Sequence, residues 1–146
     1  MSEKNFWTLV RGSLPLKMYR VENKVMKGMP DIHYIRNGES GWIELKYLPE
    51  WPKTRVGVGL RQNQSIWLQD YRKKKGKSWI LIRIGRAYTC LIDGKDAGKI
   101  QKRPSKQDFF KVVVWAKTGN MTRGDWDDLA DIISSPLRKP PKQQGQ

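Results

Sequence analysis

Apolar residues recur along the first part of the chain with two different periods. Residues 3–13 place Phe6 and Val10 four positions apart, on one side of a helix, so this segment is predicted to form a short amphipathic helix. Three later segments have the short length and apolar content of strands: 16–21, 32–35 and 41–48. The dipeptide Asn37-Gly38 separates the last two of these and is a strong hairpin-turn signal.

The rest of the chain gives a second series of signals. In chain order they predict an irregular Pro- and Gly-rich segment at 49–59, a helix at 61–75 with Gly76 at its C′ position, strands at 79–84 and 88–92, a polar, lysine-rich loop at 94–108, a strand at 109–115 and a helix that Thr122 caps and that includes Ile133. Ile66, Trp67 and Tyr71 are the predicted apolar positions of the helix at 61–75.

This order of elements favours an α/β fold with a central mixed β-sheet flanked by helices on both faces. We expect a single domain over residues 1–135, with a core at 3–93 and a C-terminal addition at 94–135. Residues 136–146 hold basic residues and prolines without an apolar anchor, so we expect a disordered basic tail.

Charge adds a candidate partner to this outline. Lys and Arg number 29 against 14 Asp and Glu, which gives a net charge of +15 and a pI near 10.1. A polyanion would relieve the resulting self-repulsion, and nucleic acid is the commonest one. The alternative is a basic soluble protein that has no such partner.

The cysteine content and the polar N-terminus give information about where in the cell the protein is located. The single cysteine, Cys90, lies in an apolar run and is expected to be a buried core residue. One cysteine cannot form an internal disulfide, and neither a signal peptide nor a membrane span is visible. We therefore expect a cytoplasmic protein without a membrane partner.

The candidate chemistry lies on the two segments that flank Asn37-Gly38. Asp31 precedes the first strand, and the sequence Trp42-Ile43-Glu44-Leu45-Lys46 forms the second. Because side chains alternate along a strand, Glu44 and Lys46 point to the same face. Hairpin pairing of the two strands would then bring Asp31 beside Glu44.

Two carboxylates and an ammonium in this arrangement suit the hydrolysis of phosphodiesters. Carboxylates bind Mg²⁺, for which Mn²⁺ can substitute, and the metal polarises the phosphate and activates water. The lysine orients that water and offsets charge in the transition state. The alternative is a solvent-facing hairpin with an ordinary Glu–Lys pair, although two charges in so apolar a strand would be costly.

Gly28-Met29-Pro30-Asp31 followed by Gly41-Trp42-Ile43-Glu44-Leu45-Lys46 resembles the PD-(D/E)xK nuclease superfamily. More narrowly, the segment is similar to VRR-NUC nucleases and to the Holliday junction resolvases of phages and archaea, since Gln64, Trp67-Leu68 and Gly76 fit the helix that follows ExK in VRR-NUC domains. The resemblance covers residues 3–93. The Pro-rich segment at 49–59 departs from the shortest family members.

The resemblance implies a restriction-endonuclease-like core and a metal-dependent endonuclease acting on branched DNA, located in the host cytoplasm if it is encoded by a phage. The implied catalytic residues are Glu3, Asp31, Glu44, Lys46 and Gln64, and the predicted metal ligands are Asp31, Glu44 and Leu45. Glu3 matches the family's glutamate on the first helix, and Glu22 is the rival for that role. Two alternative hypotheses remain. The first is a non-catalytic nucleic-acid-binding module, and the second is an exonuclease, a nicking enzyme or a restriction-type enzyme on the same fold.

Further residues are candidates for DNA binding and for the interface of a homodimer. The candidate DNA-contacting cations, for which solvated surface charge is the alternative, are Arg20, Lys24, Lys27, Lys53, Arg55 and Arg61. His33 is expected to be a packed or exposed strand residue. Resolution of a four-way junction needs two symmetric cuts, so a homodimer is expected. Trp51, Trp115 and Trp126 either supply its interface or fill the core of one subunit.

Overall fold

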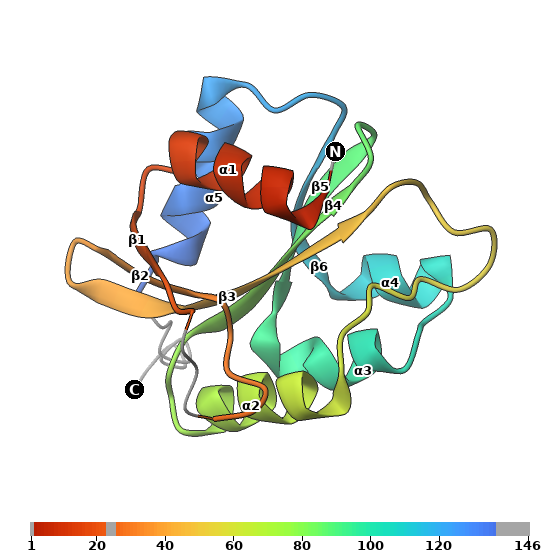
Figure 1. Cartoon of the computed structure of the whole chain (residues 1–146), viewed down its shortest axis with the longest axis horizontal. Coiled ribbons are helices and arrows are strands. Elements are labelled where there is room, and N and C mark those ends of the chain that lie inside the picture. Colours follow the sequence, from red (N-terminus) through yellow and green to blue (C-terminus); the bar gives the residue numbers. More distant parts are fainter. Residues whose placement is uncertain (1, 23–25, 137–146) are drawn as a thin grey trace, which may run out of the picture.

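The computed structural model describes residues 2–22 and 26–136, and it forms a six-stranded mixed sheet covered by helices on both faces (Figure 1). The elements, in chain order, are α1 (Glu3–Ser13), β1 (Lys17–Arg20), β2 (Ile32–Arg36), β3 (Glu39–Leu48), α2 (Gln62–Lys73), β4 (Ser78–Ile84), β5 (Tyr88–Asp93), the 3₁₀ turn η1 (Gly94–Asp96), α3 (Ala97–Gln101), α4 (Lys106–Val112), β6 (Val113–Thr118) and α5 (Arg123–Ile133). The predicted α/β class and the order of helix, three strands, helix and two strands are confirmed.

The strands lie in the sheet in the order of the sequence, from β1 to β6. Neighbouring strands are antiparallel except β3 and β4, which are parallel and are joined through α2. The β2–β3 hairpin turns at Asn37 and Gly38, whose φ values of 51° and 80° are those of a tight primed turn. This turn fixes the register that pairs Ile32 with Ile43.

Two apolar layers cover the sheet. On one face, α1 and α5 pack on a cluster that includes Ile43 and Leu45 of β3. On the other face, α2, α3 and α4 cover a cluster that includes Ile80 and Ile82 of β4 (Figure 1). Every residue of β4 is buried, as its continuous apolar sequence predicts for a central strand.

The predictions for residues 94–115 were wrong in part. The expected loop at 94–108 holds η1, α3 and the start of α4, and the expected strand at 109–115 begins only at Val113. Ser105 caps α4 by accepting a hydrogen bond from the main-chain N–H of Asp108 (3.2 Å), and Phe109 and Val112 then face the core at helical spacing. A continuous apolar run suits a buried strand or a buried helix turn, so the run alone did not locate the boundary.

Helix α2 also differs from its prediction. Its buried positions are Gln64, Ser65 and Leu68, whereas Ile66 faces outward with 57% of its surface exposed. The left-handed residue after the helix is Lys75 (φ 71°) and not Gly76. Gly76 is required for a different reason, because a Cβ there would lie 2.1 Å from the ring of Tyr71.

Helix α5 is capped and docked as its sequence suggests. Thr122 and Asp125 form a capping box, in which each side chain accepts a hydrogen bond from the main-chain N–H of the other residue. At the other end of the helix, the buried hydroxyl of Tyr34 donates to the Ile133 carbonyl (2.9 Å). Within residues 2–22 and 26–136, no helix is long and apolar enough to cross a bilayer.

Candidate active site

Glu44 and Lys46 both lie on the α2 side of β3 and are almost fully buried. Glu44 is 2% exposed and Lys46 is 8% exposed, and they lie beside Ile80 and Ile82 of the neighbouring strand. The residues that alternate with them point into the opposite apolar layer. The predicted common face is therefore observed, and the solvent-facing hairpin is not. Charged groups buried at this depth require polar partners.

Gln64 supplies a polar partner to each of them. Its Oε1 accepts hydrogen bonds from Lys46 Nζ (3.3 Å) and from the main-chain N–H of Arg61 (3.0 Å), while its Nε2 donates to Glu44 Oε1 (3.3 Å). The side chain is only 4% exposed and belongs to the first turn of α2. One amide thus joins the carboxylate and the ammonium, and its own orientation is fixed by the helix N-terminus.

Asp31 lies at the entry to β2, next to this network in the strand register. Its carbonyl accepts a hydrogen bond from the main-chain N–H of Val21 (2.8 Å), which holds it at the end of the β1–β2 ladder. The last β2–β3 pair is Ile32 with Ile43, so the next position outward sets Asp31 opposite Glu44. Residues directly opposite in antiparallel strands share a face. The register of the hairpin is therefore the one that the expected proximity of Asp31 and Glu44 requires.

The loop before Asp31 packs on the N-terminus of α2. Gly28 has a φ of 85°, which favours glycine, and a Cβ there would lie 2.3 Å from the Asn63 carbonyl oxygen. Asn63 precedes Gln64 in the chain, so the same turn of helix contacts both the Asp31 loop and the buried charges of β3. The glycine of the Gly28–Asp31 motif permits this close approach.

The donor set suits a hard divalent cation. The main-chain N–H of Trp42 donates a hydrogen bond to the Lys77 carbonyl (3.0 Å), so the main-chain groups of Trp42 point toward β4. Successive residues of a strand direct these groups to opposite sides. Leu45 is three residues further along β3, so its carbonyl points toward β2. There it lies beyond the last β2–β3 pair, on the side of Asp31. Two carboxylates and one carbonyl offer the oxygen ligands that Mg²⁺ prefers. Across the residues that the structure describes, no group of three His, Cys, Asp or Glu side chains that could hold a metal ion is found.

The choice between Glu3 and Glu22 stays open. Glu3 is exposed in the first turn of α1, which covers the face of the sheet opposite Glu44 and Lys46. Glu22 follows Val21, whose N–H is bonded to Asp31, and it lines a surface pocket together with Lys4 of the first turn of α1. The two carboxylates are thus candidates from the same region of the surface, and the role of either one stays a prediction.

The predicted DNA-contacting cations lie in different surroundings. Arg20 lies over the ring of Trp7 (5.7 Å to the centroid), and Arg55 donates to the Arg103 carbonyl (3.0 Å). Lys53 and Arg61 are exposed, and Lys27 lies at the edge of a pocket on α2. Lys24 falls outside the described residues.

The sequence reading missed a group of cations on the C-terminal addition. Arg55 lines a pocket with Lys99, Lys102 and Lys111, which belong to the α3–α4 region that was expected to be a loop and a strand. The main chains of the two segments are joined, because Val56 N–H donates to the Pro104 carbonyl (2.8 Å). The lysine content was visible in the sequence, but its link to the 49–59 segment depends on this tertiary contact.

His33, Cys90 and Trp51 pack against neighbouring side chains. The ring of His33 lies 4.9 Å from that of Trp42, and burial lowers the pKa of His33. Cys90 is a buried core residue, as expected, and burial raises the pKa of its thiol. Trp51 packs against Tyr88 (5.1 Å between centroids) and two phenylalanines, so it fills a local core.

The comparisons with known proteins found matches among solved structures. No protein-family profile matches this chain, and no curated protein sequence matches it. Among solved structures, the chain is similar to Hjc, a Holliday junction resolvase from the archaeal hyperthermophile Archaeoglobus fulgidus. The two are 17% identical over 64% of this chain and 74% of that chain, with a TM-score of 0.45.

Proposed function

We propose that this protein is a metal-dependent DNA endonuclease that hydrolyses phosphodiester bonds in branched or otherwise structured DNA, such as a Holliday junction. The observation that carries the proposal is the buried network of Glu44, Gln64 and Lys46 at the end of the strand ladder where Asp31 begins β2. A structural role alone would not require two opposite charges inside an apolar layer, because apolar residues fill such positions at less cost. Clusters of this kind are typical of functional sites.

Each residue has a definable task in this mechanism. Asp31, Glu44 and the Leu45 carbonyl would hold Mg²⁺ or Mn²⁺, which supplies Lewis acidity at the scissile phosphate. Lys46 places a positive charge beside these carboxylates, where it orients the attacking water and offsets negative charge in the transition state. Gln64 holds the ammonium and the carboxylate at fixed positions, so little reorganisation is needed during the reaction.

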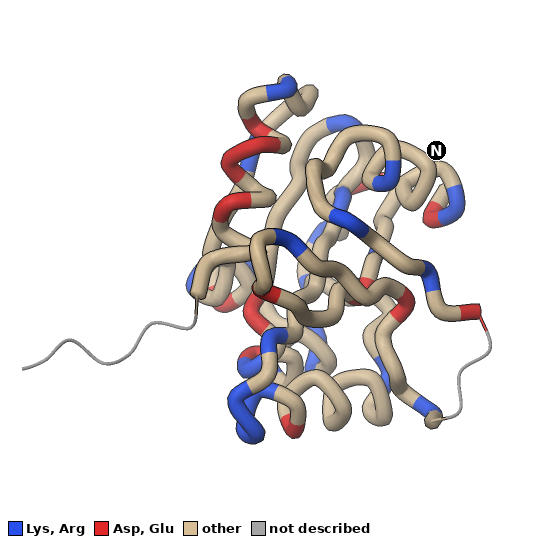
Figure 2. The backbone as a smooth tube through the Cα atoms, turned by 90° about the vertical axis from the view of Figure 1, so that its left-hand side faces the viewer, with Lys and Arg blue, Asp and Glu red and all other residues tan. Residues whose placement is uncertain are grey.

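The charge distribution supports DNA as the substrate. Helix α5 carries Asp125, Asp127, Asp128 and Asp131, whereas Lys and Arg gather at the C-terminal end of α2 (Figure 2). Helix α5 covers the sheet face opposite Glu44 and Lys46, and α2 covers theirs. The carboxylates of α5 therefore disfavour a polyanion beside that helix, whereas the cations of α2 attract one to the face that holds the proposed site.

Isosteric variants test the proposal on a four-way junction, a fork, a duplex and single-stranded DNA. With Mg²⁺ present, Asp31→Asn, Glu44→Gln and Lys46→Met should each abolish cleavage and leave DNA binding intact, because binding rests on surface cations. The matched control is Glu50→Gln, at an exposed glutamate just after β3. Normal cleavage by all three variants, or full wild-type cleavage in EDTA, would contradict the proposal.

We further propose that the enzyme acts as a homodimer with two-fold symmetry, because two symmetric cuts resolve a four-way junction. The three tryptophans proposed for the interface all pack within the subunit: Trp51 lies in a local cluster, Trp126 of α5 is buried, and the half-buried Trp115 of the edge strand β6 packs against the same cluster as Trp126. Val114, the neighbour of Trp115, is exposed. This exposed apolar residue makes the β6 edge the candidate seam.

A further inference from the structure

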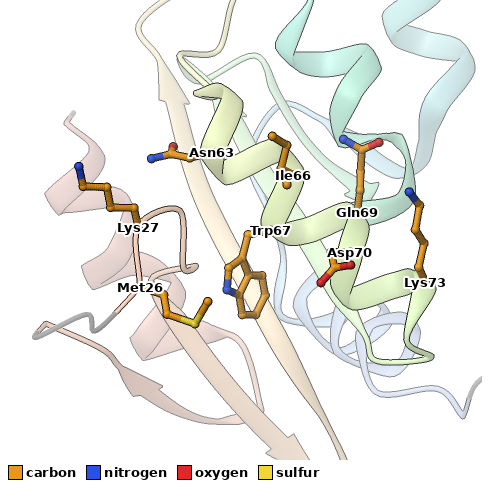
Figure 3. A pocket seen from close by; sticks show the side chains of 8 residues that line it. All are labelled: Met26, Lys27, Asn63, Ile66, Trp67, Gln69, Asp70 and Lys73. Carbon is orange, nitrogen blue, oxygen red and sulfur yellow. The ribbon is translucent and has the colours of Figure 1, made fainter.

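An open cavity of about 460 Å³ lies beside the proposed active site, between the loop that carries Met26 and Lys27 and the outer face of α2 from Asn63 to Lys73 (Figure 3). We call it the α2 pocket. Its walls include Met26, 61% exposed, and Ile66, 57% exposed. These two exposed apolar side chains come from segments far apart in the sequence and border one cavity. The pocket therefore presents apolar surface to the solvent.

The floor of the α2 pocket is fixed by aromatic packing. The ring of Trp67 stacks on that of Tyr71, with centroids 4.9 Å apart and planes 9° apart, and it meets the edge of Trp42 at 5.6 Å. Trp67 is half-buried and lines the cavity. A ring held on two sides loses little conformational entropy when a flat ligand packs against it. The pocket thus offers a preorganised surface for a planar ring.

The α2 pocket lies close to the buried charges of β3. Asn63 lines the cavity and precedes Gln64, and Trp67 lies three residues after Gln64, which is about 5 Å along a helix. The loop on the other wall continues through Gly28 to Asp31. A nucleotide in the pocket would therefore adjoin the phosphate at the proposed site.

Charge and hydrogen-bonding groups around the cavity match a nucleotide. Lys27 and Lys73 line its two ends, and the one carboxylate in its lining, Asp70, is paired with Lys74 at 2.7 Å. Asn63 and Gln69 also line the cavity with side-chain amides. Cations for phosphates, an apolar platform for a ring and polar amide groups are thus present together.

We propose that the α2 pocket holds an unstacked nucleobase of the DNA strand next to the cleaved bond, so that the enzyme selects DNA with an unpaired base beside the cut. This inference rests on the proposed nuclease function. Base stacking on a protein platform contributes about tenfold or more in affinity per base. Paired duplex keeps its bases stacked inside the helix and gains nothing from the pocket.

The test compares Ile66→Ser with Ile35→Ser, the same change at an isoleucine of β2 that is 42% exposed and lies outside the pocket. Binding is measured without divalent metal, on duplex DNA with and without one unpaired 2-aminopurine. Ile66→Ser should lose about tenfold in affinity for the unpaired probe only, and Ile35→Ser should lose none. The probe's fluorescence should be quenched on wild-type protein and restored with Ile66→Ser.

An abasic probe completes the cycle. Removing the base should cost wild-type protein at least as much as Ile66→Ser does, and combining both changes should cost no more than removing the base alone. Equal losses on paired and unpaired probes, or additive losses in the cycle, would overturn the inference. So would self-association that Ile66→Ser abolishes, which would assign the pocket to a second copy of the chain. These measurements need no cleavage, so they would still show whether the pocket binds a base if the nuclease proposal failed.

Discussion

Gln64 is the residue on which the geometry of the site depends most. Its three hydrogen bonds join it to Lys46, to Glu44 and to the main chain of Arg61, with donor–acceptor distances of 3.0–3.3 Å. A buried amide of this kind separates two opposite charges by a fixed distance and satisfies a polar atom of each. Without it, both charges would remain buried with one fewer partner, and Lys46 would be free to change rotamer.

We therefore expect Gln64→Leu, a change of similar volume, to lower the rate of DNA cleavage by about 10²-fold, because a small displacement of a catalytic group has this effect. The free energy of unfolding should fall by about 1–3 kcal/mol, the usual cost of depriving buried polar groups of a partner. Single-turnover cleavage and urea denaturation measure the two effects. Gln62→Leu, at an exposed residue of the same helix, is the control. A Gln64→Leu enzyme with the wild-type rate would show that the network is structural only.

Contacts between elements set the position of Asp31 relative to β3. The loop before Asp31 touches the start of α2 through Gly28, and α2 in turn reaches β3 through Gln64. Two glycines with similar positive φ values differ in whether they contact a neighbouring element. Gly28 (φ 85°) approaches the Asn63 carbonyl, whereas Gly59 (φ 79°) has open space where a Cβ would lie.

Substitution of these two glycines by alanine should separate backbone strain from displacement of the loop. Both Gly28→Ala and Gly59→Ala place a side chain at positive φ, with a cost of about 1 kcal/mol in the free energy of unfolding. Only Gly28→Ala forces the loop away from α2, so its cleavage rate should fall further than that of Gly59→Ala. Chemical denaturation and cleavage kinetics on the same preparations test this pair. Equal activity of the two variants would mean that the loop does not position Asp31.

At the scale of the whole molecule, charge is divided between the two faces of the sheet. The acidic helix α5 lies on one face, and the cations at the C-terminal end of α2 lie on the other (Figure 2). The cations near Arg55 line a pocket with residues of α3 and α4, which also cover that second face. Since a net charge of +15 opposes the approach of two subunits, a dimer seam should be apolar and away from the basic surface. The β6 edge offers one exposed apolar residue for such a seam, Val114.

We expect sedimentation at micromolar concentration to give about twice the 17.1 kDa mass of one chain. Val114→Lys should shift the protein toward the monomer, because it places a charge in the proposed seam. Ile35→Ser, remote from β6 in the sheet order, should not. A monomer both free and on junction DNA would remove the paired-cut mechanism and favour a single-strand nicking enzyme.

The local features of the site can be predicted from the amino-acid sequence alone. Alternation along β3 placed Glu44 and Lys46 on one face, and the Asn37-Gly38 turn fixed the register that brings Asp31 opposite Glu44. Both features follow from backbone geometry over a few residues, so they are legible without the rest of the fold. The resemblance to VRR-NUC helices also pointed to Gln64, although not to the contacts that it makes.

Which surfaces meet depends on contacts between elements that are distant in the chain. Helix α2 turns Gln64 and Leu68 inward and leaves Ile66 in solvent, because η1, α3 and β4 pack against the other side of the helix. The apolar run at 109–115 divides between α4 and β6 because Ser105 caps a helix there, whereas hydrophobicity alone fits either element. Burial and partner choice depend on residues distant in the chain, and for that reason local periodicity could not predict the α2 pocket or the junction of Arg55 with α3 and α4.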